Sequence, residues 1–179
     1  MRTKFDDAIA FVFEAEGGYT MDPKDPGGET MFGISRVHAP AWKGWAVVDA
    51  KKKEPDFPAS VNADADLKDQ AKEIYRLNFW EPLRCEELPY GLALGLFDMG
   101  VNQGVGTAIK IFQRTLGVKD DGVFGPKTMA AALAAPDRMQ TLLLARRLVA
   151  YHDLMKAKPN LEIYAMNWFH RVVTLARHL

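Results

Sequence analysis

The sequence predicts a mainly α-helical protein with at most a small β-hairpin near residues 19–34. Apolar residues recur at helical spacing through most segments, whereas alternating strand patterns are few. Turn-forming glycines and prolines gather between residues 17 and 35. The length of 179 residues and the hydrophobic content of 48% suit one compact unit with a sizeable core.

The first helix has a start signal, an apolar face and a stop signal. Thr3 and Asp6 resemble a capping box, in which each residue satisfies a backbone N–H of the other. Phe5 and Val12 then share a face with other apolar residues of the segment. Gly17 follows and ends the pattern, so we expect a helix from about residue 4 to residue 16.

Helical patterns return after a mixed stretch at residues 36–63, where we expect a loop with a short helix. Gly117 follows one of the later helices as a typical C-terminal cap, and Pro126 suits the first position of another. Asp137 and Asn160 are predicted to cap the last two helices. The predicted later helices lie at residues 62–80, 88–103, 105–116, 125–135, 138–155 and from 160 onward.

Composition excludes several classes of protein. The formal net charge is zero and the pI is about 6.9, so no general attraction to nucleic acid or anionic lipid is expected. No stretch approaches the roughly 18 apolar residues of an integral membrane segment. The N-terminal segment makes a poor secretory signal, and we therefore expect synthesis in the cytoplasm without a signal peptide.

The sequence indicates no metal site, no cofactor site and no reactive thiol. The four histidines lack metal-ligand spacing, and the sequence contains no nucleotide-binding motif, so we predict no metal and no cofactor. Cys85 is the one cysteine, which excludes an intrachain disulfide. Its acidic neighbours disfavour a thiolate, and we interpret Cys85 as a packing residue.

Glu16 is the candidate catalytic residue that the pattern itself selects. At 100° per residue it lies about 20° from Phe5 and about 40° from Val12, and so belongs to the apolar face. Desolvation there, and the negative end of the helix dipole, favour the neutral acid that donates a proton. Glu14 points elsewhere and is expected to be solvated.

Further polar residues follow Glu16 in the turn-rich segment. Asp22, Asp25, Glu29 and Thr30 stand among prolines and glycines that can fold a second carboxylate back toward Glu16. An acid at a helix end and a second carboxylate on a following turn are the equipment of glycoside hydrolysis. The alternative interpretation, that the two aspartates are only turn residues, remains open because Asp-Pro is a common turn sequence.

These residues resemble a known family. "EGGYTMDPKDPGGETMFGIS" is similar to the signature of glycoside hydrolase family 108, the N-acetylmuramidases often labelled secretion-activating proteins. "IYRLNFWEPL" resembles that family's Tyr-x-x-x-Phe/Tyr-Trp-x-Pro segment, and residues 87–131 with "NWFHRV" resemble its predicted peptidoglycan-binding region. The resemblance implies a catalytic part at residues 1–92 and a peptidoglycan-binding helical part at residues 93–179, packed as one compact unit.

The resemblance implies a lysozyme-like helical fold and cleavage of the β-1,4 bond between N-acetylmuramic acid and N-acetylglucosamine in peptidoglycan. Glu16 matches the family's catalytic glutamate. Phage lysozymes carry a related Glu-x8-Asp-x5-Thr pattern whose Asp and Thr place the attacking water. Asp25 and Thr30 match it except that four residues separate them here, which leaves Asp22 as an alternative. Tyr19 is expected to support the site or to pack beside it.

Asp98 and Asn102 are further candidates for contacts with the substrate. They form an i, i+4 pair on an otherwise apolar helix, and either face the groove or form a buried hydrogen-bonded pair.

Alternatives from other classes remain open at this stage. They are a non-catalytic peptidoglycan-binding or secretion-helper protein, a lytic transglycosylase with one glutamate, and a chitin- or chitosan-cleaving enzyme. The expected partner is the peptidoglycan glycan strand, reached in the periplasm or cell wall. A holin, as for a phage endolysin, or a bacterial secretion machinery are the expected export routes.

Overall fold

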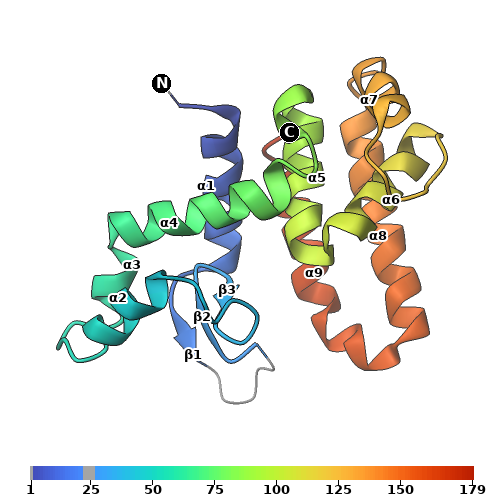
Figure 1. Ribbon diagram of the computed structural model, residues 1–179. Helices are drawn as coiled ribbons and strands as arrows, with labels where there is room; N and C mark the ends of the chain where they lie inside the picture. The colour runs from blue at the N-terminus through green and yellow to red at the C-terminus, as the bar shows by residue number, and fades with distance from the viewer. Residues whose placement is uncertain (1, 22–26) are drawn as a thin grey trace. The chain divides into compact units, whose positions relative to one another are not determined.

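The computed structural model describes residues 2–21 and 27–179, which form two compact units. One unit comprises Ile9–Arg76, and the other comprises the residues up to Ala8 together with Leu77–Leu179. Helices dominate both units, and the strands form one small antiparallel sheet (Figure 1). The predicted mainly α-helical, lysozyme-like fold is confirmed.

Helix α1 spans Lys4–Glu16 and begins with the predicted capping box. The backbone N–H of Thr3 donates to Asp6 Oδ2 over 2.8 Å, and the backbone N–H of Asp6 donates to Thr3 Oγ1 over 3.1 Å. Each residue thereby satisfies a backbone donor that the helix itself leaves unpaired. The helix ends at Glu16 because Gly17 adopts a left-handed backbone with φ of +77°.

The sheet follows α1 and contains β1 (Thr20–Met21), β2 (Glu29–Met31) and β3 (Ile34–Ser35). All neighbouring strands are antiparallel, and β2 lies between the other two. The predicted β element near residues 19–34 is therefore confirmed, with its third strand reaching Ser35. In Figure 1 the sheet lies at the C-terminal end of α1, the end that carries Glu16.

Strands β2 and β3 are joined by a two-residue turn, Phe32 and Gly33. Both residues have positive φ, +49° and +75° respectively, as the tight turns that match strand twist require. Glycine adopts this backbone without steric cost, whereas phenylalanine does not. Burial of Phe32 stabilises the turn, because its ring stacks on Phe13 of α1 with centroids 5.3 Å apart.

Three helices complete the first unit: α2 (Gly44–Lys51), α3 (Ala59–Asn62) and α4 (Ala65–Tyr75). Asp64 caps α4, since its Oδ1 accepts from the backbone N–H of Leu67 over 2.9 Å. The inward face of α4 buries Leu67 and Tyr75, as the apolar period predicts. The predicted helix continues past Tyr75 as a π-helical turn over Arg76–Trp80.

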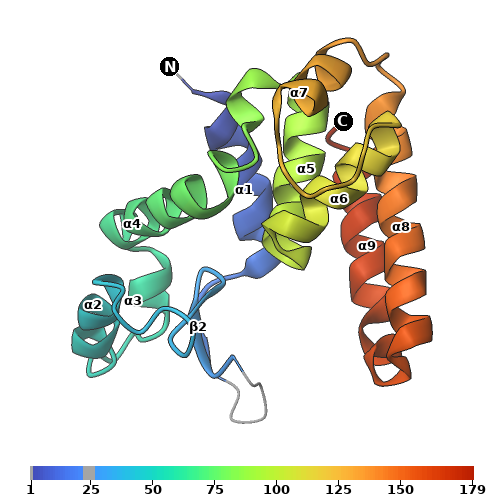
Figure 2. The same cartoon turned by 45° about the vertical axis from the view of Figure 1, so that its right-hand side comes forward.

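The second unit is built around α5 (Tyr90–Gln103), whose residues from Leu92 to Gly100 are all buried. Figure 2 shows α8 (Met139–Ala157) and α9 (Ala165–Ala176) lying side by side and antiparallel. The remaining elements are the 3₁₀ turns Cys85–Glu87 and Pro159–Tyr164, α6 (Val105–Leu116) and α7 (Pro126–Leu133). The predicted roles of Gly117, a left-handed cap, and Pro126, a first helical residue, are confirmed.

The two caps predicted for the last helices are wrong. Helix α8 follows Arg138, which already has a helical backbone and provides no side-chain cap. The first N–H of α8 instead donates to Pro136 O over 2.8 Å, so this N–H has a backbone partner and not the Asp137 side chain. Asn160 lies inside the 3₁₀ turn that precedes α9, and the chain enters α9 already coiled.

Cys85 is buried and its thiol lies 3.6 Å from Ala93 O. Burial first, and the neighbouring Glu86 second, raise the pKa of the Cys85 thiol well above its usual range. The thiol is therefore inert, and the interpretation of Cys85 as a packing residue is confirmed.

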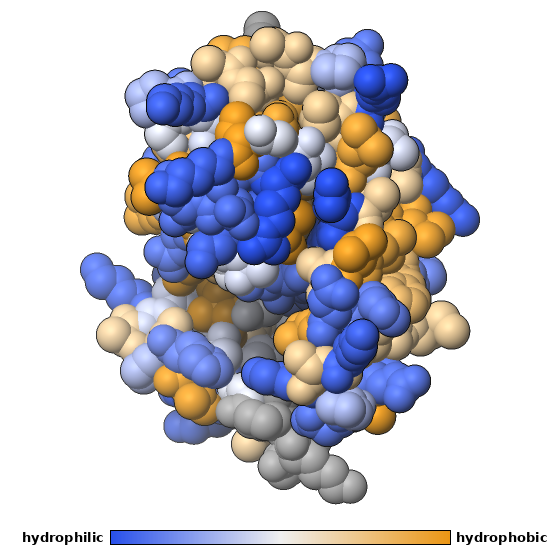
Figure 3. Space-filling model, turned by 90° about the vertical axis from the view of Figure 1, so that its right-hand side faces the viewer, coloured by the Kyte–Doolittle hydropathy of each residue, from blue (hydrophilic) through white to orange (hydrophobic). Residues whose placement is uncertain are grey.

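The surface seen in Figure 3 mixes hydrophilic side chains with smaller groups of hydrophobic ones. The most exposed large apolar side chains include Ile163 and Met166, which are 78% and 77% exposed. Across the part of the chain that the structure describes, no helix combines the length and apolar character needed to cross a bilayer.

Candidate active site

Glu16 lies in the last turn of α1, where the helix stops and the sheet begins. The left-handed Gly17 closes this turn, and its N–H donates to Phe13 O over 3.0 Å. The Glu16 side chain is partly exposed, whereas Glu14 is fully on the surface. A partly covered carboxyl at the end of a rigid helix has the fixed position that proton donation requires.

The turn between β2 and β3 lies directly against the Glu16 carboxyl. A Cβ atom built on Gly33 would lie 3.0 Å from both Cγ and Oε2 of Glu16, and closer still to Tyr75 Oη. The buried Tyr75 in turn donates from its hydroxyl to Phe32 O over 2.9 Å. Gly33 therefore allows a carboxyl, a hairpin turn and a phenol to meet in one place.

Sequence reasoning missed this contact between α1, the hairpin and α4. In the sequence, Tyr75 stands out only as the tyrosine of the "IYRLNFWEPL" segment. The available signal was the "MFGI" sequence at residues 31–34, in which a glycine between apolar residues marks either a tight hairpin or a close backbone approach.

Tyr19 lies between α1 and β1, and both its backbone and its ring make contacts. Its backbone N–H donates to Asn62 Oδ1 over 2.8 Å, and its ring meets the ring of Phe57 at a centroid distance of 4.6 Å. Burial first, and the nearby Glu29 second, raise the pKa of the Tyr19 phenol. Tyr19 is therefore a neutral hydroxyl at physiological pH, and its contacts to Phe57 and Asn62 give it a packing role.

Thr30 occupies the centre of the sheet, directly opposite Thr20 on β1. The two hydroxyl oxygens are 2.5 Å apart, so one donates to the other. Asp22 and Asp25 lie outside the described residues. The predicted separation between the carboxyl groups of Glu16 and Asp25 therefore stays a prediction.

Glu29 forms a salt-bridge cluster beside this site that the sequence did not reveal. Its two carboxylate oxygens lie 2.6 Å from Lys52 Nζ and 2.7 Å from Arg36 Nε. Arg36 also pairs with Asp49 and covers the ring of Trp45. With its side chain only 9% exposed and both oxygens paired, Glu29 ties the sheet to α2 as a structural residue.

Asp98 and Asn102 belong to the second unit, where they have different surroundings. Asp98 is completely buried and accepts from Arg147 Nη1 over 2.5 Å and from Arg171 Nη2 over 2.7 Å. The burial of Asp98 therefore agrees with the second alternative, a buried hydrogen-bonded side chain, but the partners of its carboxylate are arginines. Asn102 is partly exposed, and its Oδ1 accepts from the hydroxyl of Tyr151.

The fold and the family match together define a lysozyme-like glycoside hydrolase. The family described as Glycosyl hydrolase 108 matches residues 9–104, and the Predicted Peptidoglycan domain matches residues 107–173. The chain therefore belongs to the glycosyl hydrolase 108 family.

A solved structure supports this assignment over nearly the whole chain. The protein is similar to the structure titled "Structure of Brucella abortus SagA", with 30% sequence identity and a TM-score of 0.72. The match covers 97% of this chain and 92% of that one. No curated protein matches the sequence.

Proposed function

We propose that the protein is an N-acetylmuramidase that hydrolyses the β-1,4 bond between N-acetylmuramic acid and N-acetylglucosamine, with Glu16 as its general acid. The position of Glu16 carries the proposal. Its carboxyl is partly covered at the end of α1 and lies against the Phe32–Gly33 turn. Membership of the glycosyl hydrolase 108 family and the peptidoglycan domain support the substrate class.

The proposed reaction begins with protonated Glu16. It donates its proton to the glycosidic oxygen as the bond from that oxygen to the anomeric carbon breaks. Positive charge develops on the sugar ring in an oxocarbenium-like transition state. Water then adds to the anomeric carbon and gives up a proton to the second carboxylate, so that the products are two sugars with intact hydroxyl groups.

Asp25 is the proposed second carboxylate, and Thr30 is proposed to help it orient the water. Asp22 is the alternative acceptor. A separation of about 6.5–9.5 Å between the two carboxyl groups leaves room for water and inverts the anomeric centre, whereas about 5 Å leads to retention through a covalent intermediate. The anomer released first, observed by NMR, distinguishes the two.

Replacement of Glu16 by glutamine tests the proposal. Glu16→Gln keeps the shape of the side chain but cannot donate the proton, so release of reducing ends from purified peptidoglycan should fall by at least about 100-fold. Glu14→Gln is the matched control, because Glu14 is an exposed glutamate of the same helix. Circular dichroism checks that both variants keep the fold.

Product analysis by mass spectrometry separates the alternatives. Reducing muropeptides from the native chain support the muramidase. Anhydro products would replace it with a lytic transglycosylase, and cleavage of chitin in preference to peptidoglycan would change the substrate. Binding without cleavage would leave a non-catalytic peptidoglycan-binding protein. We place the activity in the periplasm or cell wall, where the substrate lies.

A further inference from the structure

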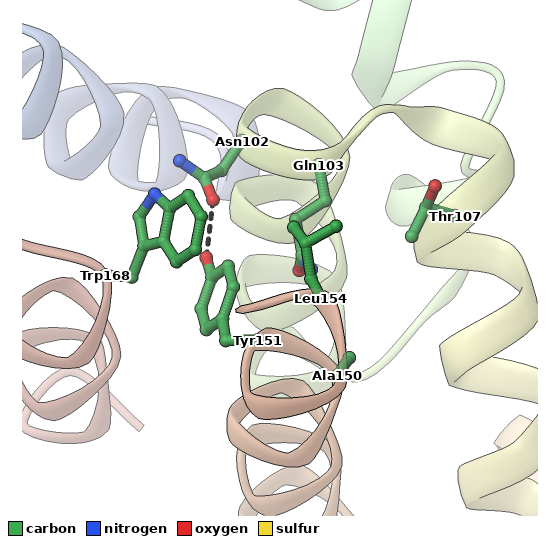
Figure 4. Close-up of a pocket in the computed structure, with 7 residues that line it drawn as sticks. All are labelled: Asn102, Gln103, Thr107, Ala150, Tyr151, Leu154 and Trp168. Atoms are coloured by element: carbon green, nitrogen blue, oxygen red, sulfur yellow. Dashed lines mark hydrogen bonds between the residues drawn. The ribbon is translucent and has the colours of Figure 1, made fainter. Parts of the chain in front are cut away.

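The second unit contains a cavity whose lining includes none of the residues proposed for the cleavage. It has a volume of about 420 Å³, within the range of small-molecule sites. Figure 4 shows that side chains from four helices converge on it: α5, α6, α8 and α9. The side chains that matter for its chemistry are Asn102, Gln103, Thr107, Tyr151, Leu154 and Trp168.

Aromatic and aliphatic groups form one side of the cavity. The rings of Tyr151 and Trp168 stack with their centroids 4.8 Å apart and their planes 14° from parallel. Tyr151 is fully buried, whereas Trp168 is partly exposed. Leu154 adds an aliphatic surface. An apolar lining of this kind suits the C–H groups of a pyranose ring and the methyl of an acetyl group.

Asn102 supplies a hydrogen-bond donor whose orientation is fixed by Tyr151 and Arg147. Arg147 Nε donates to the Tyr151 hydroxyl over 3.1 Å, and that hydroxyl donates to Asn102 Oδ1, the contact dashed in Figure 4. Since the oxygen of the amide is held by Tyr151, its NH₂ group turns the other way. Asn102 therefore offers N–H groups for a carbonyl oxygen of a ligand.

Gln103 supplies the complementary acceptor. Its Oε1 is buried and has no hydrogen-bond partner. A buried acceptor left unpaired is costly and rare in native structures, so its presence beside a cavity calls for an explanation. Gln103 lines the cavity, so a ligand N–H bound there is the partner that this oxygen lacks.

We propose that this cavity binds the N-acetyl group of a hexosamine in the peptidoglycan glycan strand. The acetamido carbonyl accepts from Asn102, its N–H donates to Gln103 Oε1, and its methyl and the sugar ring lie against Leu154 and Trp168. The inference rests on the proposed function only in taking the glycan strand as the ligand. It gives the second unit a subsite for one sugar, formed by Asn102 and Gln103 from the part matched by the glycosyl hydrolase family and by Leu154 and Trp168 from the peptidoglycan domain.

The test is an NMR titration of the full chain with the disaccharide N-acetylglucosaminyl-N-acetylmuramic acid. In this disaccharide the glycosidic bond starts from the anomeric carbon of N-acetylglucosamine. The muramidase is proposed to cleave at the anomeric carbon of N-acetylmuramic acid, so binding is observed without hydrolysis. We expect saturable shifts of the Trp168 indole N–H and the Asn102 side-chain amide signals. The N-deacetylated disaccharide should leave these signals unchanged, as should a free stem peptide, which tests peptide amides as the alternative source.

Two variants keep the test independent of folding. Gln103→Leu removes the unpaired acceptor and should weaken binding about tenfold without lowering Tm, because no native hydrogen bond is lost. Asn102→Asp keeps the oxygen that Tyr151 needs but loses the donor, and should weaken binding similarly. Gln140→Leu on α8 is the matched control, a partly exposed glutamine away from the cavity, and should bind as the native chain does.

Each outcome is decisive for the cavity. Equal binding by the native chain and Gln103→Leu, shifts with the stem peptide in place of the disaccharide, or no shift at Trp168 would overturn the proposal. Failure of the proposed muramidase has a different signature, namely an absence of reducing ends from peptidoglycan. That result leaves the titration and its interpretation unchanged.

Discussion

At the scale of single residues, the position of Glu16 depends on a residue that has no side chain. Gly33 meets two separate requirements: a φ of +75° in the β2–β3 turn, and space for Glu16 and Tyr75. Any Cβ at this position takes the space that the carboxyl occupies. The carboxyl proposed as the general acid and the hairpin are thus coupled through van der Waals contact.

Gly33→Ala should therefore reduce activity far more than it reduces stability. The added Cβ overlaps Tyr75 Oη and presses on the Glu16 carboxyl, so both must shift. Displacement of a catalytic group by about 1 Å costs on the order of 100-fold in rate. The left-handed backbone adds about 1–2 kcal/mol of destabilisation for a residue with a Cβ. Reducing-end release and Tm measure the two effects separately.

Gly117→Ala provides the matched control for that substitution. Gly117 has a similar φ of +70°, and nothing lies within 4 Å of a Cβ built there. It should lose only the stability that the left-handed backbone costs, and it should keep the native rate. A folded Gly33→Ala protein with the native rate would show that the contact with Glu16 does not position the acid.

At the scale of elements, α4 depends on the side chain that starts it. Asp64 accepts from the backbone N–H of Leu67 and pairs with Lys51 Nζ at 2.9 Å, which joins the start of α4 to the end of α2. The N–H of Leu67 first, and Lys51 second, hold the pKa of the Asp64 carboxyl below its usual value. The charged form of Asp64 is the one that stabilises the helix.

Asp64→Ala should lower the free energy of unfolding by about 1 kcal/mol at pH 7. Because the pKa of Asp64 is lowered in the folded state, its contribution is present above the unfolded value of about 3.9 and is lost as pH falls through the folded value. The difference between variant and native protein should therefore shrink below about pH 4. Thermal unfolding followed from pH 7 to pH 3 measures it.

Asp69→Ala is the control on the same helix, because the Asp69 side chain is 70% exposed and pairs with Lys72 at the surface. Its effect should stay within about 0.5 kcal/mol. If the cost of Asp64→Ala is the same at pH 3 as at pH 7, the charge of the cap contributes nothing to α4.

At the scale of the whole molecule, a buried carboxylate links three helices of the second unit. Asp98 on α5 binds Arg147 of α8 and Arg171 of α9, which lie 49 and 73 residues further along the chain. Asp98 and Arg147 have no exposed side-chain surface. Charges buried to this extent are tolerated because they are paired and hydrogen-bonded.

Asp98→Ala should destabilise the protein by about 3–5 kcal/mol, because it leaves a buried arginine without its counter-charge. Urea unfolding followed by circular dichroism measures the loss. Asp153→Ala, an exposed aspartate on α8, serves as the control and should change stability by less than about 0.5 kcal/mol. A loss below about 1 kcal/mol for Asp98→Ala would show that the network does not hold these helices.

Much of the fold was predictable because its signals are local. The capping box at Thr3 and Asp6, the stop at Gly17 and the left-handed cap at Gly117 each depend on a few neighbouring residues. The helical spacing of apolar residues also agrees with the face of α4 that is buried. The caps expected at Asp137 and Asn160 failed because the chain was already coiled before each helix began, which no short pattern reveals.

The sequence by itself determined the helical fold class, the place of the small sheet and the choice of Glu16. These follow from periodicity, turn chemistry and the family motif, all of which involve residues close together in the chain. Only the tertiary structure decided that Gly33 and Tyr75 lie against Glu16, that two arginines surround Asp98, and that Asn102 and Gln103 border a cavity. Such contacts join residues far apart in the sequence, and side-chain packing, not local preference, selects them.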